Sequence, residues 1–181
     1  MTKLRQNKAM LAGIIIILFF VLVALLADLI SPYDPSTLGV AYQKPSREHL
    51  LGTNDLGQDI FSEMIYGVRV SLFLGIFSAL IVTFVGSVLA LIAGYYGGAA
   101  DRIVCAVTDI AMAVPSLPLT LLLIAYLKSG VFSLVLAISI TAWTGTARIL
   151  RSRVRQICRL PYIQIEKTLG VKTPVSLFRQ V

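Results

Sequence analysis

The feature that most constrains this 181-residue sequence is a set of four runs that contain no charged residue. The runs are Met10–Ala27, Val70–Ala100, Ile110–Leu127 and Ser129–Ala147. Each contains at least 18 residues, and a helix of about 20 apolar residues crosses about 30 Å of hydrocarbon. With 57% hydrophobic and only 14% charged residues, the chain differs from ordinary soluble domains. These runs predict an all-α, polytopic transmembrane helix bundle with four spans.

The distribution of charge predicts which side of the membrane each end occupies. Eight of the 16 Lys and Arg residues lie in the last 35 positions, and Lys3, Arg5 and Lys8 precede the first run. Residues 31–69 lean towards acidic side chains instead. Since positive charge is retained in the cytoplasm, we expect both termini inside and residues 31–69 outside. The net charge of +7 is explained by this topology and by anionic lipids, without nucleic acid.

Four segments follow from this pattern. Residues 1–30 hold an N-terminal tail and the first span, residues 31–69 lie outside, residues 70–150 hold three core spans, and residues 151–181 lie inside. In the outer segment, Gln58–Val68 has one apolar stripe at helical spacing. We expect a separate short helix there, lying either along the outer interface or on top of the bundle.

The second span, expected near Val70–Ala93, has small residues at four-residue spacing. One row is Ser71, Gly75, Ala79, Thr83 and Ser87, and the other is Ser78, Gly86, Ala90 and Gly94. Small residues let helices approach closely in lipid, where no hydrophobic effect drives them together. We therefore expect this helix at the centre of the bundle, with Gly86 at a packing contact.

The third span, expected near Ile103–Leu127, contains Asp109, Pro115 and Pro118. The prolines should kink the helix and free backbone carbonyls at mid-depth, where protein or a water-filled path must receive them. A carboxylate in a span is a functional candidate, but Asp109 is close enough to the inner end to pair with Arg102. Both alternatives, a structural ion pair and a place on a transport path, remain open, and the fourth span is expected over Val131–Ile149.

Motifs for several other functions are missing from the sequence. It has no G-x-x-x-x-G-K-[ST] phosphate loop and no H-E-x-x-H motif, and His49 is the only histidine. We expect no catalytic residue, no metal site and no cofactor of its own. Cys105 and Cys158 are far apart in sequence and are expected to be thiols.

Several motifs together resemble the binding-protein-dependent ABC permeases of the dipeptide, oligopeptide and nickel group. They are SPYDP at Ser31–Pro35, LGTNDLGQDIFS at Leu51–Ser62, YGVRVSL at Tyr66–Leu72, AGYYGG at Ala93–Gly98, and Asp109 with Pro115-Ser116. The resemblance covers the whole chain in order. It implies a multi-pass protein of a bacterial or archaeal cell membrane with about six spans, of which four are expected here. We therefore expect the chain to be truncated at its C-terminal end.

The resemblance also implies partners and a coupling segment. The partners would be a second permease subunit, cytoplasmic ATPase subunits that bind the ATP, an extracytoplasmic substrate-binding protein and membrane lipids. The family's Glu-Ala-Ala triplet, which docks on the ATPase, corresponds to Gln164, Ile165 and Glu166, and Gly170 matches the family's glycine. The triplet therefore departs from the family pattern at its acid and at a small residue. The implied substrates are short peptides, with nickel or a metal chelate as the alternative; a non-transporting fragment or a four-helix scaffold or channel is the alternative of another class.

Overall fold

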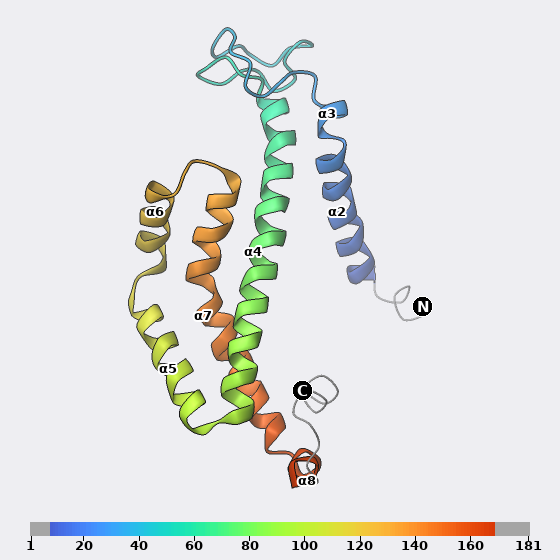
Figure 1. Ribbon diagram of the computed structural model, residues 1–181. Helices are drawn as coiled ribbons and strands as arrows, with labels where there is room; N and C mark the ends of the chain where they lie inside the picture. Colours follow the sequence, from blue (N-terminus) through green and yellow to red (C-terminus); the bar gives the residue numbers. More distant parts are fainter. Residues whose placement is uncertain (1–7, 169–181) are drawn as a thin grey trace. The chain divides into compact units, whose positions relative to one another are not determined.

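The computed structural model describes residues 8–168 as helices joined by one long loop (Figure 1). In this range the helices are α2 (Lys8–Leu25), α3 (Ala27–Ile30), α4 (Ile60–Tyr96), α5 (Gly98–Ala113), α6 (Ser116–Tyr126), α7 (Val131–Cys158) and α8 (Pro161–Thr168). Three of them, α2, α4 and α7, are long and apolar enough to cross a membrane, and α5 with α6 makes a fourth candidate. The expected all-α transmembrane fold is confirmed.

The chain divides within α4 into two compact units, Met1–Gly75 and Ile76–Val181, and each is described by itself. In the first unit, Asp59 joins the long loop, residues 31–59, to the start of α4. Its buried carboxylate accepts hydrogen bonds from the backbone N–H and the hydroxyl of Ser62, at 2.8 and 2.7 Å, and lies 3.0 Å from Nδ1 of His49. A carboxylate here satisfies N–H groups that the first turn of a helix leaves open, so Asp59 fixes where α4 begins.

A second polar contact in the first unit links α3 to α4. Asp28 accepts hydrogen bonds from the hydroxyl of Tyr66 at 2.8 Å and from the guanidinium of Arg69 at 3.1 and 3.2 Å. The acid that ends the first apolar run is therefore neutralised by a cation from the start of α4. Charge pairing of this kind lowers the cost of placing both groups at a membrane boundary.

The prediction of a separate helix over Gln58–Val68 is wrong. α4 is continuous for 37 residues and includes both that segment and the expected second span. The helix is continuous because residues 60–96 contain no proline. It ends before Gly97, which adopts a left-handed backbone conformation with φ at +64°. At about 1.5 Å per residue, α4 is about 55 Å long and exceeds the hydrocarbon thickness.

The expected third span is also corrected, because it is two helices and not one kinked helix. α5 and α6 are bent by 82° at a short break. Val114 has an extended backbone, as a residue before proline prefers, and Pro115 caps α6. Pro118 then falls in the first turn of α6, where a missing N–H costs no helical hydrogen bond. Pro115 therefore determines the position of the break.

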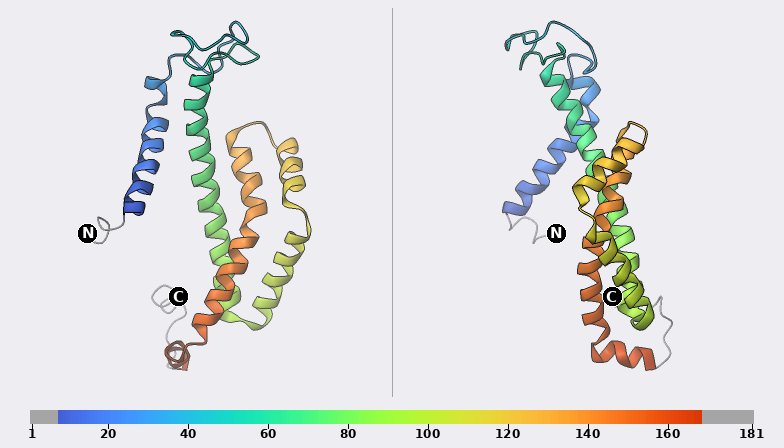
Figure 2. Two further views of the ribbon diagram at one scale, coloured as in Figure 1. Left: turned by 180° about the vertical axis from the view of Figure 1, so that it is seen from behind. Right: turned by 90° about the vertical axis from the view of Figure 1, so that its left-hand side faces the viewer.

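In the second unit, α7 is the helix against which the others lie. α5 and α6 follow one another along one side of it, as Figure 1 and the left-hand view of Figure 2 show. α7 also continues beyond the predicted end at Ile149 to Cys158, so several of the C-terminal arginines belong to it. After Arg159 and Leu160 the chain turns, and α8 lies across the end of α7 in the right-hand view of Figure 2.

Candidate functional site

The first functional candidate is an ion-pair cluster between the start of α5 and the end of α7. Asp101 accepts hydrogen bonds from Nε and Nη2 of Arg151, at 2.5 and 2.8 Å, and lies 3.4 Å from Nη1 of Arg155. The Asp101 side chain is only 12% exposed. Gly97 and Gly98 both have positive φ, a turn that glycine makes at little cost, and it places Asp101 in the first turn of α5. The carboxylate also lies where the helix dipole favours negative charge.

Two turns further along α5, Asp109 accepts a hydrogen bond from Nη2 of Arg148 at 2.8 Å. Both side chains are more than half exposed. The proposed pairing with Arg102 is therefore wrong: the partner comes from α7, because the two acids of α5 face the arginines of an adjacent helix. Whether Asp109 also lies on a transport path stays a prediction.

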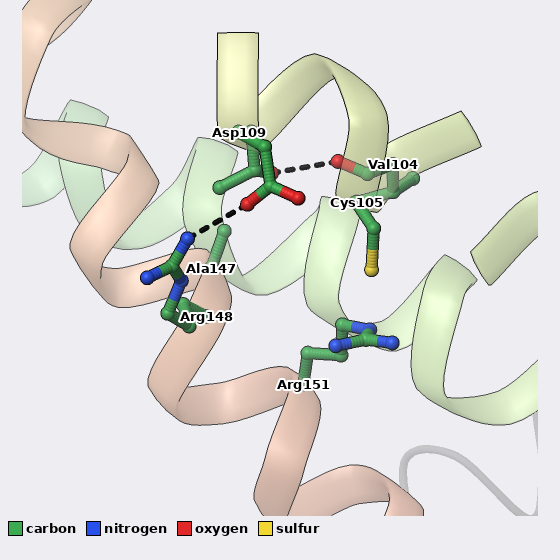
Figure 3. Close-up of a pocket in the computed structure, with 7 residues that line it drawn as sticks. Val104, Cys105, Asp109, Ala147, Arg148 and Arg151 are labelled. Carbon is green, nitrogen blue, oxygen red and sulfur yellow. Dashed lines mark hydrogen bonds and ion pairs between the residues drawn. The ribbon is translucent and has the colours of Figure 1, made fainter. Parts of the chain in front are cut away.

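A cavity of about 270 Å³ lies between these two ion pairs (Figure 3). Its lining residues come from α5 and α7 and are Val104, Cys105, Thr108, Asp109, Ala147, Arg148 and Arg151. In Figure 3 the sulfur of Cys105 lies on the side of the cavity nearer to Arg151, while Asp109 reaches Arg148. The Thr108 hydroxyl donates to the carbonyl of Val104 at 2.7 Å, so it is already used within α5. The cavity wall is thus largely occupied by groups that satisfy one another.

The second candidate is a larger groove of about 780 Å³ where α5 and α6 separate. It is lined by residues from the end of α5, the start of α6 and the middle of α7, including Val114, Ser116 and Thr141. At the start of α6, the N–H of Leu119 donates to the carbonyl of Pro115 at 3.2 Å, and the hydroxyl of Thr120 donates to the carbonyl of Ser116 at 2.8 Å. Thr120 also lies 3.3 Å from the hydroxyl of Thr141 on α7. The groove therefore combines apolar walls with a few hydroxyl groups at the break.

Gly86 lies at a close contact between α4 and α7. A Cβ atom on Gly86 would be 2.8 Å from Cβ and 2.9 Å from Cγ2 of Thr146. The same holds two turns later, where a Cβ on Gly94 would be 2.6 Å from Cγ1 of Val154. Ala90, between them, is fully buried. One of the two small-residue rows thus faces α7, whereas a Cβ on Gly75, in the other row, would meet nothing within 4 Å.

The third candidate is α8, which contains Gln164, Ile165 and Glu166. Gln164 donates from Nε2 to the carbonyl of Cys158 at 2.6 Å and so fastens α8 to the end of α7. Ile163 is completely buried, whereas Ile165 is 58% exposed. Gly170, the fourth predicted residue of this segment, lies outside the described residues. The predicted site residues therefore occupy three separate places: the α4–α7 contact, the α5–α6 break with Asp109, and α8.

Sequence reasoning missed the cluster around Asp101. A signal was present: Arg148, Arg151 and Arg155 are three and four residues apart, which places them on one helix face. Asp101 and Asp109 of α5 are eight residues apart, and Arg148 and Arg155 are seven residues apart, so the two pairs span nearly the same length of helix. The matching spacing would have predicted pairing once α7 was extended beyond the apolar run.

Comparison with known proteins covers the whole chain. The profile of the family described as "Binding-protein-dependent transport system inner membrane component" matches residues 86–181. The profile described as "N-terminal TM domain of oligopeptide transport permease C" matches residues 1–51. The first of these matches contains the end of α4 and all of α5–α8, and hence all three candidate sites.

Among individual relatives, the chain is similar to an oligopeptide transport system permease protein, OppC, of Bacillus subtilis (strain 168), with 39% identity over all of this chain and 60% of the relative. A dipeptide transport system permease protein, DppC, of the same strain is 35% identical over 94% of the chain and 54% of the relative. A glutathione transport system permease protein, GsiD, of Pectobacterium atrosepticum is 36% identical over 98% of the chain and 60% of the relative. The chain thus spans 54–60% of the length of these curated relatives.

Proposed function

Because the chain belongs to the family of binding-protein-dependent transport system inner membrane components, we propose that it is a permease subunit of an ATP-driven importer of short peptides. The observation that carries the proposal is the family match over residues 86–181, which coincides with the packed helices α5–α8. Peptides are the proposed substrate class, in preference to nickel, because the relatives are named for oligopeptide, dipeptide and glutathione transport.

The groove at the α5–α6 break is the proposed contribution of this chain to the translocation path. Transporters place substrate sites beside interrupted helices, because broken backbone is tolerated in a membrane only where protein or a water-filled cavity receives its polar groups. Here the hydroxyl groups of Ser116, Thr120 and Thr141 lie at the break. The hydroxyls of Thr120 and Thr141 donate to carbonyls of their own helices, so their oxygen atoms remain as acceptors. They can accept hydrogen bonds from the N–H groups of a peptide backbone without fixed charge, which suits transport of peptides with different side chains.

The coupling element is proposed to be α8. It is a short helix at the end of the basic part of α7, with one isoleucine buried against its own chain and the next one, Ile165, exposed. An exposed apolar side chain on a helix of this kind suits insertion into a groove of a partner protein. ATP would be bound and hydrolysed on that partner, an ATPase subunit, and its movement would be passed to α7 through Gln164.

The remaining partners and the orientation belong to the same proposal. A second permease subunit would complete the path, and a substrate-binding protein would deliver peptide to the outer loop, residues 31–59. Both termini would be cytoplasmic, since the basic end of α7 and α8 then face the ATPase.

Cysteine crosslinking tests the coupling element. We expect Ile165→Cys, in a chain whose Cys105 and Cys158 are serine, to crosslink to a co-expressed ATPase subunit. Tyr126→Cys is the matched control, since this side chain is 85% exposed but lies at the end of α6, away from α8 (Figure 1).

Crosslinking at both positions, or at Tyr126 alone, would contradict the assigned orientation. Absence of a crosslink at Ile165, with the ATPase subunit present in the same membranes, would remove the coupling role and favour a membrane scaffold. A parallel measurement of labelled peptide uptake separates loss of docking from loss of the transport function itself.

A further inference from the structure

A pocket of about 280 Å³ lies near the end of α7, outside the two sites between helices. It is lined by Arg151, Ser152, Arg155, Gln156 and Arg159, all of them polar or charged. The groove at the α5–α6 break, by contrast, is lined mainly by apolar side chains. The composition of the α7 pocket therefore favours a small anion.

The positive charge of this pocket is only partly neutralised. Arg151 is engaged with Asp101, as described above, whereas Arg155 is 3.4 Å from the same carboxylate and its side chain is 47% exposed. Arg159 is exposed, and it takes part in none of the ion pairs formed among the side chains that the structure describes. Among the side chains that the structure describes, the three guanidinium groups of the pocket are thus accompanied by one carboxylate, that of Asp101, which leaves an excess of two positive charges.

The length of α7 places the pocket at the membrane boundary. Its 28 residues extend about 42 Å, and the hydrocarbon core is about 30 Å thick, so about eight residues must lie outside the core. The uncharged part of the helix ends at Ala147, so the residues that lie outside the hydrocarbon core are those of the arginine-rich end.

The end of α4 gives an independent marker of the same depth. Gly94 packs against Val154, so Tyr95 and Tyr96, the last residues of α4, lie level with the pocket-lining turn of α7. Tyrosine is enriched where the membrane meets water, because its ring is apolar and its hydroxyl is polar. Both helices thus indicate that the pocket lies among lipid head groups.

We propose that this pocket binds the phosphate of an anionic phospholipid between the guanidinium groups of Arg155 and Arg159. The two arginines are four residues apart and hence on one helix face, and a planar guanidinium matches the oxygens of a phosphate. Ile149 lies on the same face as Ser152 and Gln156, further into the membrane, and is 65% exposed. An acyl chain can follow that apolar surface, which a free phosphate does not need. The assignment does not depend on which substrate the protein imports.

Native mass spectrometry of the full chain in detergent, with added phosphatidylglycerol or phosphatidylcholine, tests this site. We expect selective retention of phosphatidylglycerol, a decrease of about fivefold in its affinity for Arg159→Gln, and a further decrease when Arg155→Gln is added. Arg153→Gln is the control, because it removes the same charge from the same helix at a position that does not line the pocket.

Three results would overturn the proposal. An equal loss for Arg153→Gln would mean that the lipid responds only to net charge. Displacement of the lipid by inorganic phosphate at equal concentration would identify a simple anion site. Displacement by an added ATPase subunit would assign the pocket to a protein partner. The melting temperature of each variant is measured alongside, so that unfolding is not mistaken for loss of the site.

Discussion

Replacing Gly86 with alanine is the most direct test of the contact between α4 and α7. The added Cβ would lie 2.8 and 2.9 Å from two carbon atoms of Thr146, whereas carbon atoms prefer about 3.5–4.0 Å. The helices would have to separate or bend by about 0.7–1.2 Å. Overpacking of this size costs about 1–3 kcal/mol, and the better helix propensity of alanine returns about 0.5–1 kcal/mol. The net loss of stability is therefore between about 0 and about 2.5 kcal/mol, centred on about 1 kcal/mol.

Gly75→Ala is the matched control on the same helix. A Cβ at Gly75 would meet nothing within 4 Å, so only the gain in helix propensity remains, about 0.5–1 kcal/mol. The two alanine variants should thus change stability in opposite directions. Adding Thr146→Gly to Gly86→Ala removes both clashing atoms, and the double variant should be more stable than the sum of the single changes predicts.

Unfolding of the purified chain in mixed micelles, with increasing dodecyl sulfate, measures these differences. Trp143, the only tryptophan, lies on α7 one turn before Thr146, and its fluorescence reports on this part of the helix. Equal effects of Gly86→Ala and Gly75→Ala would refute the close approach of α4 and α7. Additive effects of Gly86→Ala and Thr146→Gly would refute the identity of the contact.

Two further predictions concern the acidic residues. Burial of the Asp59 carboxyl raises its pKa, but hydrogen bonds from Ser62 and His49 outweigh this effect and hold the pKa below its ordinary value. The carboxylate should therefore stabilise the outer loop fully above the unfolded-state pKa of about 3.9, and this stability should be lost as the pH falls through the lower folded-state pKa. Hydrogen exchange of residues 31–62, corrected for intrinsic rates, should show this loss in the native chain; the same pH dependence in Asp59→Asn would exclude Asp59 as its source. Asp101→Asn should lower the free energy of unfolding by about 1.5–3 kcal/mol, because it weakens contacts of a largely buried carboxylate with two arginines. Asp109→Asn should cost less than about 1 kcal/mol in the same micelle assay, since its single pair is exposed, and equal losses would contradict this ranking.

The positions of the apolar helices could be predicted from the sequence because the requirement behind them is local. A backbone in hydrocarbon must satisfy its own polar groups, so each uncharged run has to become helix. The outer loop was likewise marked by Ser31-Pro32 and by the acidic bias of residues 31–69. Where a helix ends is less local: α4 begins at a cap made by Asp59 with His49 and Ser62, and apolar periodicity carries no information about that cap.

The candidate site was predictable only in part. Pro115 marked an interruption, but its size depends on how α6 packs on α7, which the sequence does not state. For Asp109 the sequence suggested Arg102 as the possible partner, whereas the observed partner is Arg148, because the pairing depends on which helix lies beside α5. The roles of Gln164, Ile165, Glu166 and Gly170 stay predictions from the family pattern.

The ion pairs explain why α5 remains beside α7 although the helical backbone is interrupted both before and after α5. It is preceded by Gly97 and Gly98 and followed by the break at Pro115, so the chain itself does not fix its direction. In lipid, apolar contacts give little net attraction between helices, and polar contacts therefore carry a larger share of the association. Asp101 and Asp109 supply such contacts at both ends of the α5–α7 interface. Any movement of α7 that separates these pairs would release α5 and change the groove at its far end. The ion pairs of Asp101 and Asp109 therefore connect the basic end of α7, where α8 is attached, to the groove that is proposed as the path.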